Sequence, residues 1–225
     1  MRTSFFTVVM SIIRKDFQAE WRSRELIGSM GLFALLSVLV FSFALELDRV
    51  ARSESISGVL WVTIVFASIL GLNRSMAMER DQGNLDALLL APINRAAIFV
   101  GKLAGNFVFT LVIGLLLLPL MTILYNVSLI SVWLIAVLVL GTLGFTTLGT
   151  LLAAMTVQTR SREALLPIVM MPIILPLLLS GVRASTAILS GTPQSDWIQW
   201  VQIVMVLDVI YVTMCFLLFE FVVEE

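Results

Sequence analysis

The sequence contains no histidine and only one cysteine, Cys215, which lies inside an apolar run. A lone cysteine excludes an intrachain disulfide and a redox pair. Charged residues make up 13% of the chain, about half the share in soluble domains, and the net charge is −1. This balance argues against nucleic acid as a partner. The sequence offers no metal-ligand cluster and no nucleophile–base pair, so we expect no catalytic residue, no metal site and no cofactor bound by this chain.

An ATP-binding loop is also missing from the sequence. Gly101-Lys102 lacks the earlier glycine of a P-loop, since position 96 is Ala96, and no Ser or Thr follows the lysine. We therefore do not expect an enzyme. If the protein performs work, another subunit must supply the ATP or the gradient.

Hydrophobic residues, in contrast, make up 60% of the chain, and the mean hydropathy is +1.05. Such values are typical of integral membrane proteins, whose spans need about 20 apolar residues each. The sequence predicts an all-α fold with a six-span transmembrane domain over residues 26–225. The expected spans are Leu26–Leu45, Ile56–Met76, Ile98–Tyr125, Leu129–Val157, Ala164–Ser180 and Trp197–Val223.

The fifth expected span is short and contains Pro167, Pro172 and Pro176. Proline removes a helical hydrogen bond, so we expect this span to be kinked or partly unwound. The three prolines are hinge candidates. A gating hinge and a fixed bend are both compatible with the sequence.

Residues 1–25 predict an amphipathic helix, Phe5–Glu25, ahead of the first span. Apolar residues recur there every four positions, at Phe5, Val9, Ile13, Phe17 and Trp21, and the charged residues lie elsewhere around the helix. A helix with one apolar and one basic face is suited to the membrane interface. The alternative, a signal peptide, is disfavoured by the short apolar run and the lack of a cleavage-site pattern before Arg14.

The distribution of Lys and Arg predicts the orientation of the spans. Of the 14 such residues, eleven fall in the N-terminal segment, in the second connection and the beginning of the next helix, and in the fourth connection. Cytoplasmic loops carry the excess of positive charge. We therefore expect both termini to be cytoplasmic in a multi-pass protein.

The longest polar interruption, Glu79–Arg95, predicts a short cytoplasmic helix at about 84–91. Gly83 and Asn84 supply a turn and an N-cap, Asp86 lies in the first turn, and Pro92 ends the segment. Three leucines share one face at spacings of three and four: Leu85, Leu88 and Leu89. So short a helix is unstable alone. It either lies on lipid headgroups or neighbouring spans, or it docks on a soluble partner.

Polar residues within the spans are few. Asp208 lies near the middle of the last span, and an intramembrane carboxylate is a functional candidate by default. We favour the alternative, an aspartate that hydrogen-bonds a neighbouring helix through Ser/Thr groups or proline-freed carbonyls. The G-x-x-x-G pattern at Gly101–Gly105 and the glycines at 141, 144 and 149 predict close helix packing.

An interfacial helix, six spans and a cytoplasmic helix after the second span together resemble the membrane subunit of ABC exporters of the second permease type. More narrowly, three stretches are similar to the heme exporter B family, the permeases of c-type cytochrome maturation: G-V-L-W-V-T-I-V-F-A-S-I-L-G-L-N-R at Gly58–Arg74, D-Q-G-N-L-D-A-L-L-L-A-P at Asp81–Pro92, and the proline-rich Leu166–Pro176. Asn73 departs from the family pattern, in which an acidic residue precedes the arginine, and this leaves an ion-pair role at position 73 in doubt.

The resemblance implies a homodimeric permease of the inner membrane, bound to ABC ATPase subunits that use ATP and to heme-handling membrane subunits. It implies heme as a possible substrate of the complex, either conducted or released by ATP-driven motion. It also implies an ATPase-coupling role for Gly83, Leu85, Asp86, Leu88, Leu89 and Pro92. Two alternatives are an ABC permease that exports a lipid, glycan or drug, and a membrane assembly scaffold that transports nothing.

Overall fold

The computed structural model describes residues 4–44, 49–81, 94–156 and 162–222. Over these ranges the chain forms seven α-helices and no strand, which confirms the predicted all-α class. The helices are α1 (Phe5–Ser23), α2 (Glu25–Ala44), α3 (Arg49–Asp81), α5 (Arg95–Tyr125), α6 (Val132–Thr156), α7 (Arg162–Leu189) and α8 (Gln194–Val222). All except α1 are long and apolar enough to cross a membrane, so the predicted six spans are confirmed.

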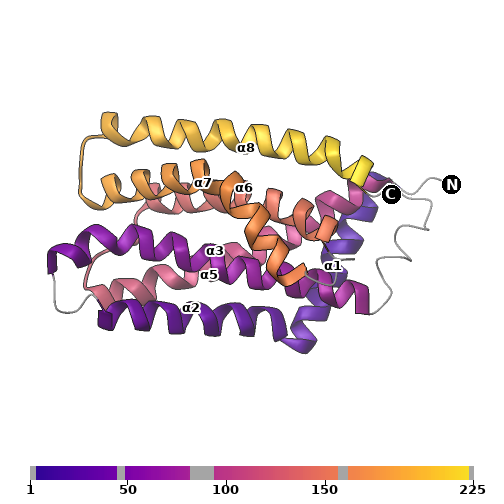
Figure 1. Ribbon diagram of the computed structural model, residues 1–225, viewed down its shortest axis with the longest axis horizontal. Coiled ribbons are helices and arrows are strands. Elements are labelled where there is room, and N and C mark those ends of the chain that lie inside the picture. The colour runs from indigo at the N-terminus through magenta and orange to yellow at the C-terminus, as the bar shows by residue number, and fades with distance from the viewer. Residues whose placement is uncertain (1–3, 45–48, 82–93, 157–161, 223–225) are drawn as a thin grey trace.

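The six spanning helices run side by side, and α1 lies across one end of the bundle (Figure 1). Successive spans alternate in direction, so that α1, the end of α3, the start of α5 and the end of α8 share that end of the bundle. Helices α3 and α6 are the most enclosed spans, whereas α2, α7 and α8 have the smallest buried shares and carry many of the exposed large apolar side chains. Such side chains are suited to contact lipid.

Small residues on α6 allow its neighbours to approach closely, as predicted. A side chain on Gly141 would collide with the Trp61 ring, one on Gly144 with the Asp208 carboxylate, and one on Gly149 with Leu72. The buried threonines between these glycines donate to carbonyls of their own helix; the bond from Thr142 Oγ1 to the Leu138 oxygen is 2.7 Å long. Their hydroxyls are therefore satisfied without water.

Trp61 of α3 fills the space between α6 and α7. Its ring lies against Gly141 of α6 and Gly181 of α7, and its Nε1 donates to Ser185 Oγ of α7 over 3.0 Å. Trp61 is buried with Val137, Ala184, Trp197 and Val201. One large side chain thus joins four spans in the half of the bundle away from α1.

Helix α7 differs from the expected fifth span. It continues to Leu189, with Pro167, Pro172 and Pro176 inside it, so the prediction of a short span ending at Ser180 was wrong. Unwinding is absent from the described part of α7, but the helix changes direction along its length (Figure 1), as expected of a proline-containing helix. Carbonyls near Pro176 gain other donors: Ser180 Oγ bonds the Pro176 oxygen, and the Tyr211 hydroxyl bonds the Ile173 oxygen.

The face of α1 that packs on the bundle is only partly the apolar stripe that was predicted to face the membrane interface. An α-helix turns by about 100° per residue, so a four-residue spacing advances about 40° beyond a full turn at each step. The predicted apolar stripe therefore winds around the helix. Phe5 and Val9 at its beginning pack on the core, whereas Trp21 at its end is 80% exposed. The buried residues of α1 are Val8, Ile12 and Glu20. Ile12 and Asp16 lie against Gly101 and Gly105 of α5.

Candidate functional site

The predicted coupling residues Gly83, Leu85, Asp86, Leu88, Leu89 and Pro92 lie outside the described residues, and their role stays a prediction. The structure does describe both flanks of their segment. Helix α3 ends at Asp81 and α5 begins at Arg95, after Asn94, whose side-chain oxygen accepts from the Ala96 amide over 2.9 Å. The chain therefore leaves and re-enters the bundle at the end where α1 lies.

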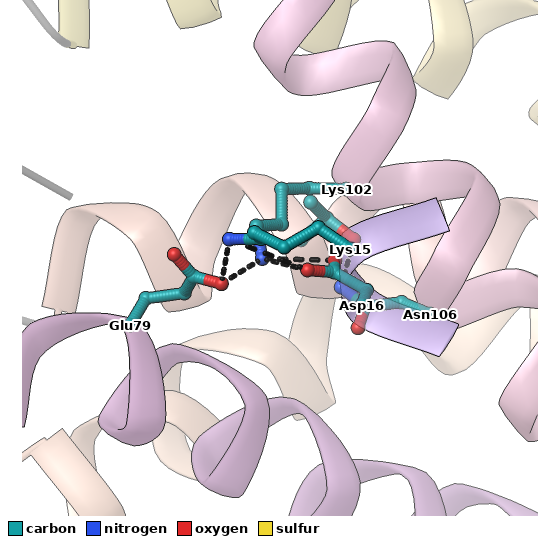
Figure 2. A network of polar contacts seen from close by, with 6 residues as sticks. Lys15, Asp16, Glu79, Lys102 and Asn106 are labelled. Atoms are coloured by element: carbon teal, nitrogen blue, oxygen red, sulfur yellow. Dashed lines mark hydrogen bonds and ion pairs between the residues drawn. The ribbon is translucent and has the colours of Figure 1, made fainter. Parts of the chain in front are cut away.

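Four charged side chains meet just inside these flanks. Lys102 of α5 donates to Asp16 of α1, with its Nζ 3.0 and 2.9 Å from Oδ1 and Oδ2, and to Glu79 Oε1 of α3 over 2.6 Å. Lys15 of α1 reaches the same Glu79 oxygen over 2.5 Å. Figure 2 shows the two lysines between the two carboxylates. We call Lys15, Asp16, Glu79 and Lys102 the ion cluster.

Glycines on α5 bring the ion cluster together. A Cβ at Gly101 would lie 2.9 Å from Cβ of Ile12, and one at Gly105 would lie 3.5 Å from Asp16 Oδ2. The predicted G-x-x-x-G packing therefore exists, and the helix packed against it is α1. Because α1 lies so close to α5, Asp16 on the next turn can contact Lys102 directly.

Burial makes the charge balance of this cluster important. The Lys102 side chain is 4% exposed, that of Glu79 8% and that of Asp16 11%. A buried charge is costly unless it is paired. Two lysines and two carboxylates cancel, and they line a cavity of about 70 Å³ together with Glu20, Ser75 and Phe109. The second Glu79 oxygen has no hydrogen-bond partner in the described part of the chain.

Further polar contacts beside the ion cluster connect its helices to α2 and α6. The Glu20 carboxylate of α1 accepts from the Leu26 and Ile27 amides at the start of α2, over 3.2 and 2.9 Å. These amides have no partner within the helix, so Glu20 satisfies them and its charge suits the helix N-terminus. On the other side, Asn106 Nδ2 of α5 donates to Thr150 Oγ1 of α6 over 3.0 Å.

The Arg74 guanidinium also pairs with a carboxylate, that of Glu25 in the first turn of α2. The residue before Arg74 is Asn73, and the acidic partner of Arg74 comes from a different helix, α2. Both side chains are half exposed, and such pairs contribute little to stability. This contact adds a link between α2 and α3 near the ion cluster.

Asp208 of α8 lies among α6, α7 and α8, against Gly144 and Leu177. It is 4% exposed, and neither carboxylate oxygen has a hydrogen-bond partner among the described residues. The expected bonds to Ser/Thr groups or proline-freed carbonyls are thus not present there. On α8, Asp208 lies about one turn before Tyr211 and about two turns before Cys215, and it is far in sequence from the ion cluster. The described residues contain no group of three or more metal-ligand side chains.

Lys102 and Glu79 were not recognised as a site from the sequence. From the sequence, Lys102 counts toward the positive charge of the second connection, although it lies four residues inside the expected span Ile98–Tyr125. A lysine inside a span is costly unless it has a partner, and this cost was the sequence feature that could have indicated a buried ion pair. The partners could not be identified, because Asp16 and Glu79 lie 86 and 23 residues away.

Comparison with known proteins gives one family. A family model described as CcmB protein matches residues 7–223. Curated relatives are named heme exporter protein B. The one from Rhodobacter capsulatus is 32% identical over 69% of this chain and 73% of the relative. The one from Bradyrhizobium diazoefficiens is 29% identical over 82% of this chain and 84% of the relative. Another, from Pseudomonas aeruginosa, is 26% identical over 80% of both chains.

Proposed function

Because the chain belongs to the CcmB family, we propose that it is the membrane permease subunit of an ABC transporter complex that exports or handles heme during c-type cytochrome biogenesis. The observation that carries this proposal is a family match covering residues 7–223, with relatives that share the name heme exporter protein B. The six spanning helices supply the membrane domain that this role requires. The subunit is a transporter component and not an enzyme.

In this proposal the chain lies in the inner membrane, with both termini in the cytoplasm. Basic residues are concentrated at the end of the bundle that α1 crosses: Arg14, Lys15 and Arg22 on α1, Arg80 near the end of α3 and Arg95 at the start of α5. Positive charge is concentrated on cytoplasmic segments, so this end of the bundle is the cytoplasmic one. The opposite end, where α7 leads into α8, faces the periplasm.

A separate ABC ATPase binds at the cytoplasmic end, and the helix at about 84–91 is its docking element. The position of this segment between the ends of α3 and α5 supports the assignment, because both helices enter the bundle directly from it. The ion cluster lies two residues before the end of α3 and seven residues after the start of α5. Motion of the docking element therefore acts on α1, α3 and α5 together. Heme is the substrate of the complex, and its remaining partners are a second copy of this chain and heme-handling membrane subunits.

The experiment uses a strain that lacks the chromosomal gene and carries a plasmid copy. Wild-type protein should restore covalently bound heme in c-type cytochromes and should co-purify with an ABC ATPase. Leu88→Asp should insert normally in the membrane but should lose both the heme-loaded cytochromes and the co-purifying ATPase, because it buries a carboxylate in the docking contact. Leu88→Met is the matched control and should keep both properties. Normal cytochromes in the deletion strain would refute the proposed function, whereas full activity of Leu88→Asp would refute only the docking role.

A further inference from the structure

Helix α1 has three different faces around its axis. One face packs on the bundle through Val8, Ile12 and the ion cluster. A second, apolar face points outward and carries Phe6, Met10 and Trp21, which are 80%, 64% and 80% exposed. The third face is polar and also exposed, and it carries Arg14, Gln18 and Arg22. A helix that only covered the bundle would need no second apolar face.

The border between the two exposed faces forms a shallow hollow. It is lined by two arginines, two aromatic residues and their neighbours: Arg14, Phe17, Gln18, Ala19, Trp21 and Arg22. Phe17 packs one side of its ring on Phe109 of α5, with the centroids 5.0 Å apart, and leaves the other side exposed. Neither Arg14 nor Arg22 forms an ion pair with a carboxylate of the described chain. The hollow thus combines positive charge with exposed aromatic rings.

The direction of α1 determines which occupant suits this hollow. The helix runs across the spans at one end of the bundle (Figure 1). In a membrane crossed by these spans its axis would be parallel to the surface, and its exposed faces would lie near headgroup depth. Aromatic residues prefer this depth, and arginine binds phosphate with two parallel hydrogen bonds. A second copy of α1 would bring the same arginines together and is disfavoured by repulsion. We propose that the hollow binds the headgroup of an anionic phospholipid, with Arg14 and Arg22 on the phosphate and Phe17 and Trp21 beside the upper acyl chains.

A basic residue near an anionic membrane surface strengthens lipid binding by about fivefold, so two arginines contribute on the order of 20- to 30-fold. The full-length chain in detergent is titrated with phosphatidylglycerol or phosphatidylcholine, and bound lipid is counted by native mass spectrometry. Wild type should prefer phosphatidylglycerol by about this factor. Arg14→Gln/Arg22→Gln should abolish the preference. Arg24→Gln/Arg183→Gln, which removes the same charge outside the hollow, should keep it.

A second measurement reports the place of binding and does not depend on the arginine variants. Brominated phosphatidylglycerol should quench Trp21, seen as the difference between wild type and Trp21→Phe, and brominated phosphatidylcholine should quench it several-fold less. Equal affinity for the two lipids, equal loss of preference in the control variant, or a Trp21 signal that neither lipid quenches would each overturn the proposal. The last outcome would indicate that protein, such as a second copy of the chain, covers this face.

Discussion

Removal of Lys102 tests whether the ion cluster holds α1 on the bundle. In Lys102→Met the side chain keeps its approximate length, but Asp16 and Glu79 lose the cation that lies 2.9 and 2.6 Å from their oxygens. Breaking a buried ion pair by removal of one partner costs about 3–5 kcal/mol. Lys15 still contacts Glu79 over 2.5 Å, so we expect the lower end of this range, about 3 kcal/mol.

The assay is equilibrium unfolding of the purified chain in mixed micelles, with wild type and variants at equal protein and detergent concentration. Lys15→Met is the first control. Its side chain is 39% exposed, so its loss should cost only about 1 kcal/mol or less. The second is Lys102→Met/Glu79→Gln, which removes one charge of each sign from the cluster and should recover part of the stability lost by Lys102→Met.

The magnitude of these differences decides the interpretation. If Lys102→Met costs less than about 1 kcal/mol, or if the added Glu79→Gln lowers stability further, the cluster does not act as a charge-balanced buried unit. In that case the close contact of Ile12 with Gly101 would account for the position of α1 by packing alone.

Three further predictions concern orientation, Asp208 and heme. In a chain with Cys215→Ser, cysteines introduced at Ser53 and Ser190 should react with an impermeant reagent in intact cells and one at Asn84 should not; labelling at Asn84 would reverse the orientation. Asp208→Asn, which preserves the shape of the side chain against Gly144, should retain activity within about twofold in c-type cytochrome assays, whereas a large loss in a well-assembled variant would indicate a need for ionisation. The purified chain without a histidine tag should bind heme weakly and give no sharp low-spin spectrum, because it has no histidine and its one thiol is buried; tight binding abolished at one Met or Tyr would refute this.

Composition and local pattern were sufficient to predict the membrane class, the number of spans and the close packing at Gly101, Gly141 and Gly144. Each of these depends on residues near one another in the sequence. The end of α7 was misplaced because the apolar run is interrupted soon after Ser180, at Arg183, although the helix continues through Arg183 to Leu189. The structure places the Arg183 guanidinium over the Trp200 ring of α8.

The ion cluster could not be predicted because its members come from three helices and meet only when α1 packs across α5. The face of α1 that packs on the bundle could not be predicted for a related reason. A four-residue spacing winds around a long helix, and only the contacts with α5 determine which part of the stripe is covered. For the segment at about 84–91 the sequence remains the only guide, and its coupling role is still a prediction.

Trp61 connects three positions that lie far apart in the sequence. Its ring occupies the space that side chains on Gly141 and Gly181 would need, and its nitrogen requires the hydroxyl of Ser185. A larger residue at either glycine is compatible with the fold only if position 61 becomes smaller at the same time. These positions are therefore constrained to evolve together, and substitutions at 61, 141 and 181 should appear as correlated changes during divergence of the family, even though 80 residues separate position 61 from position 141.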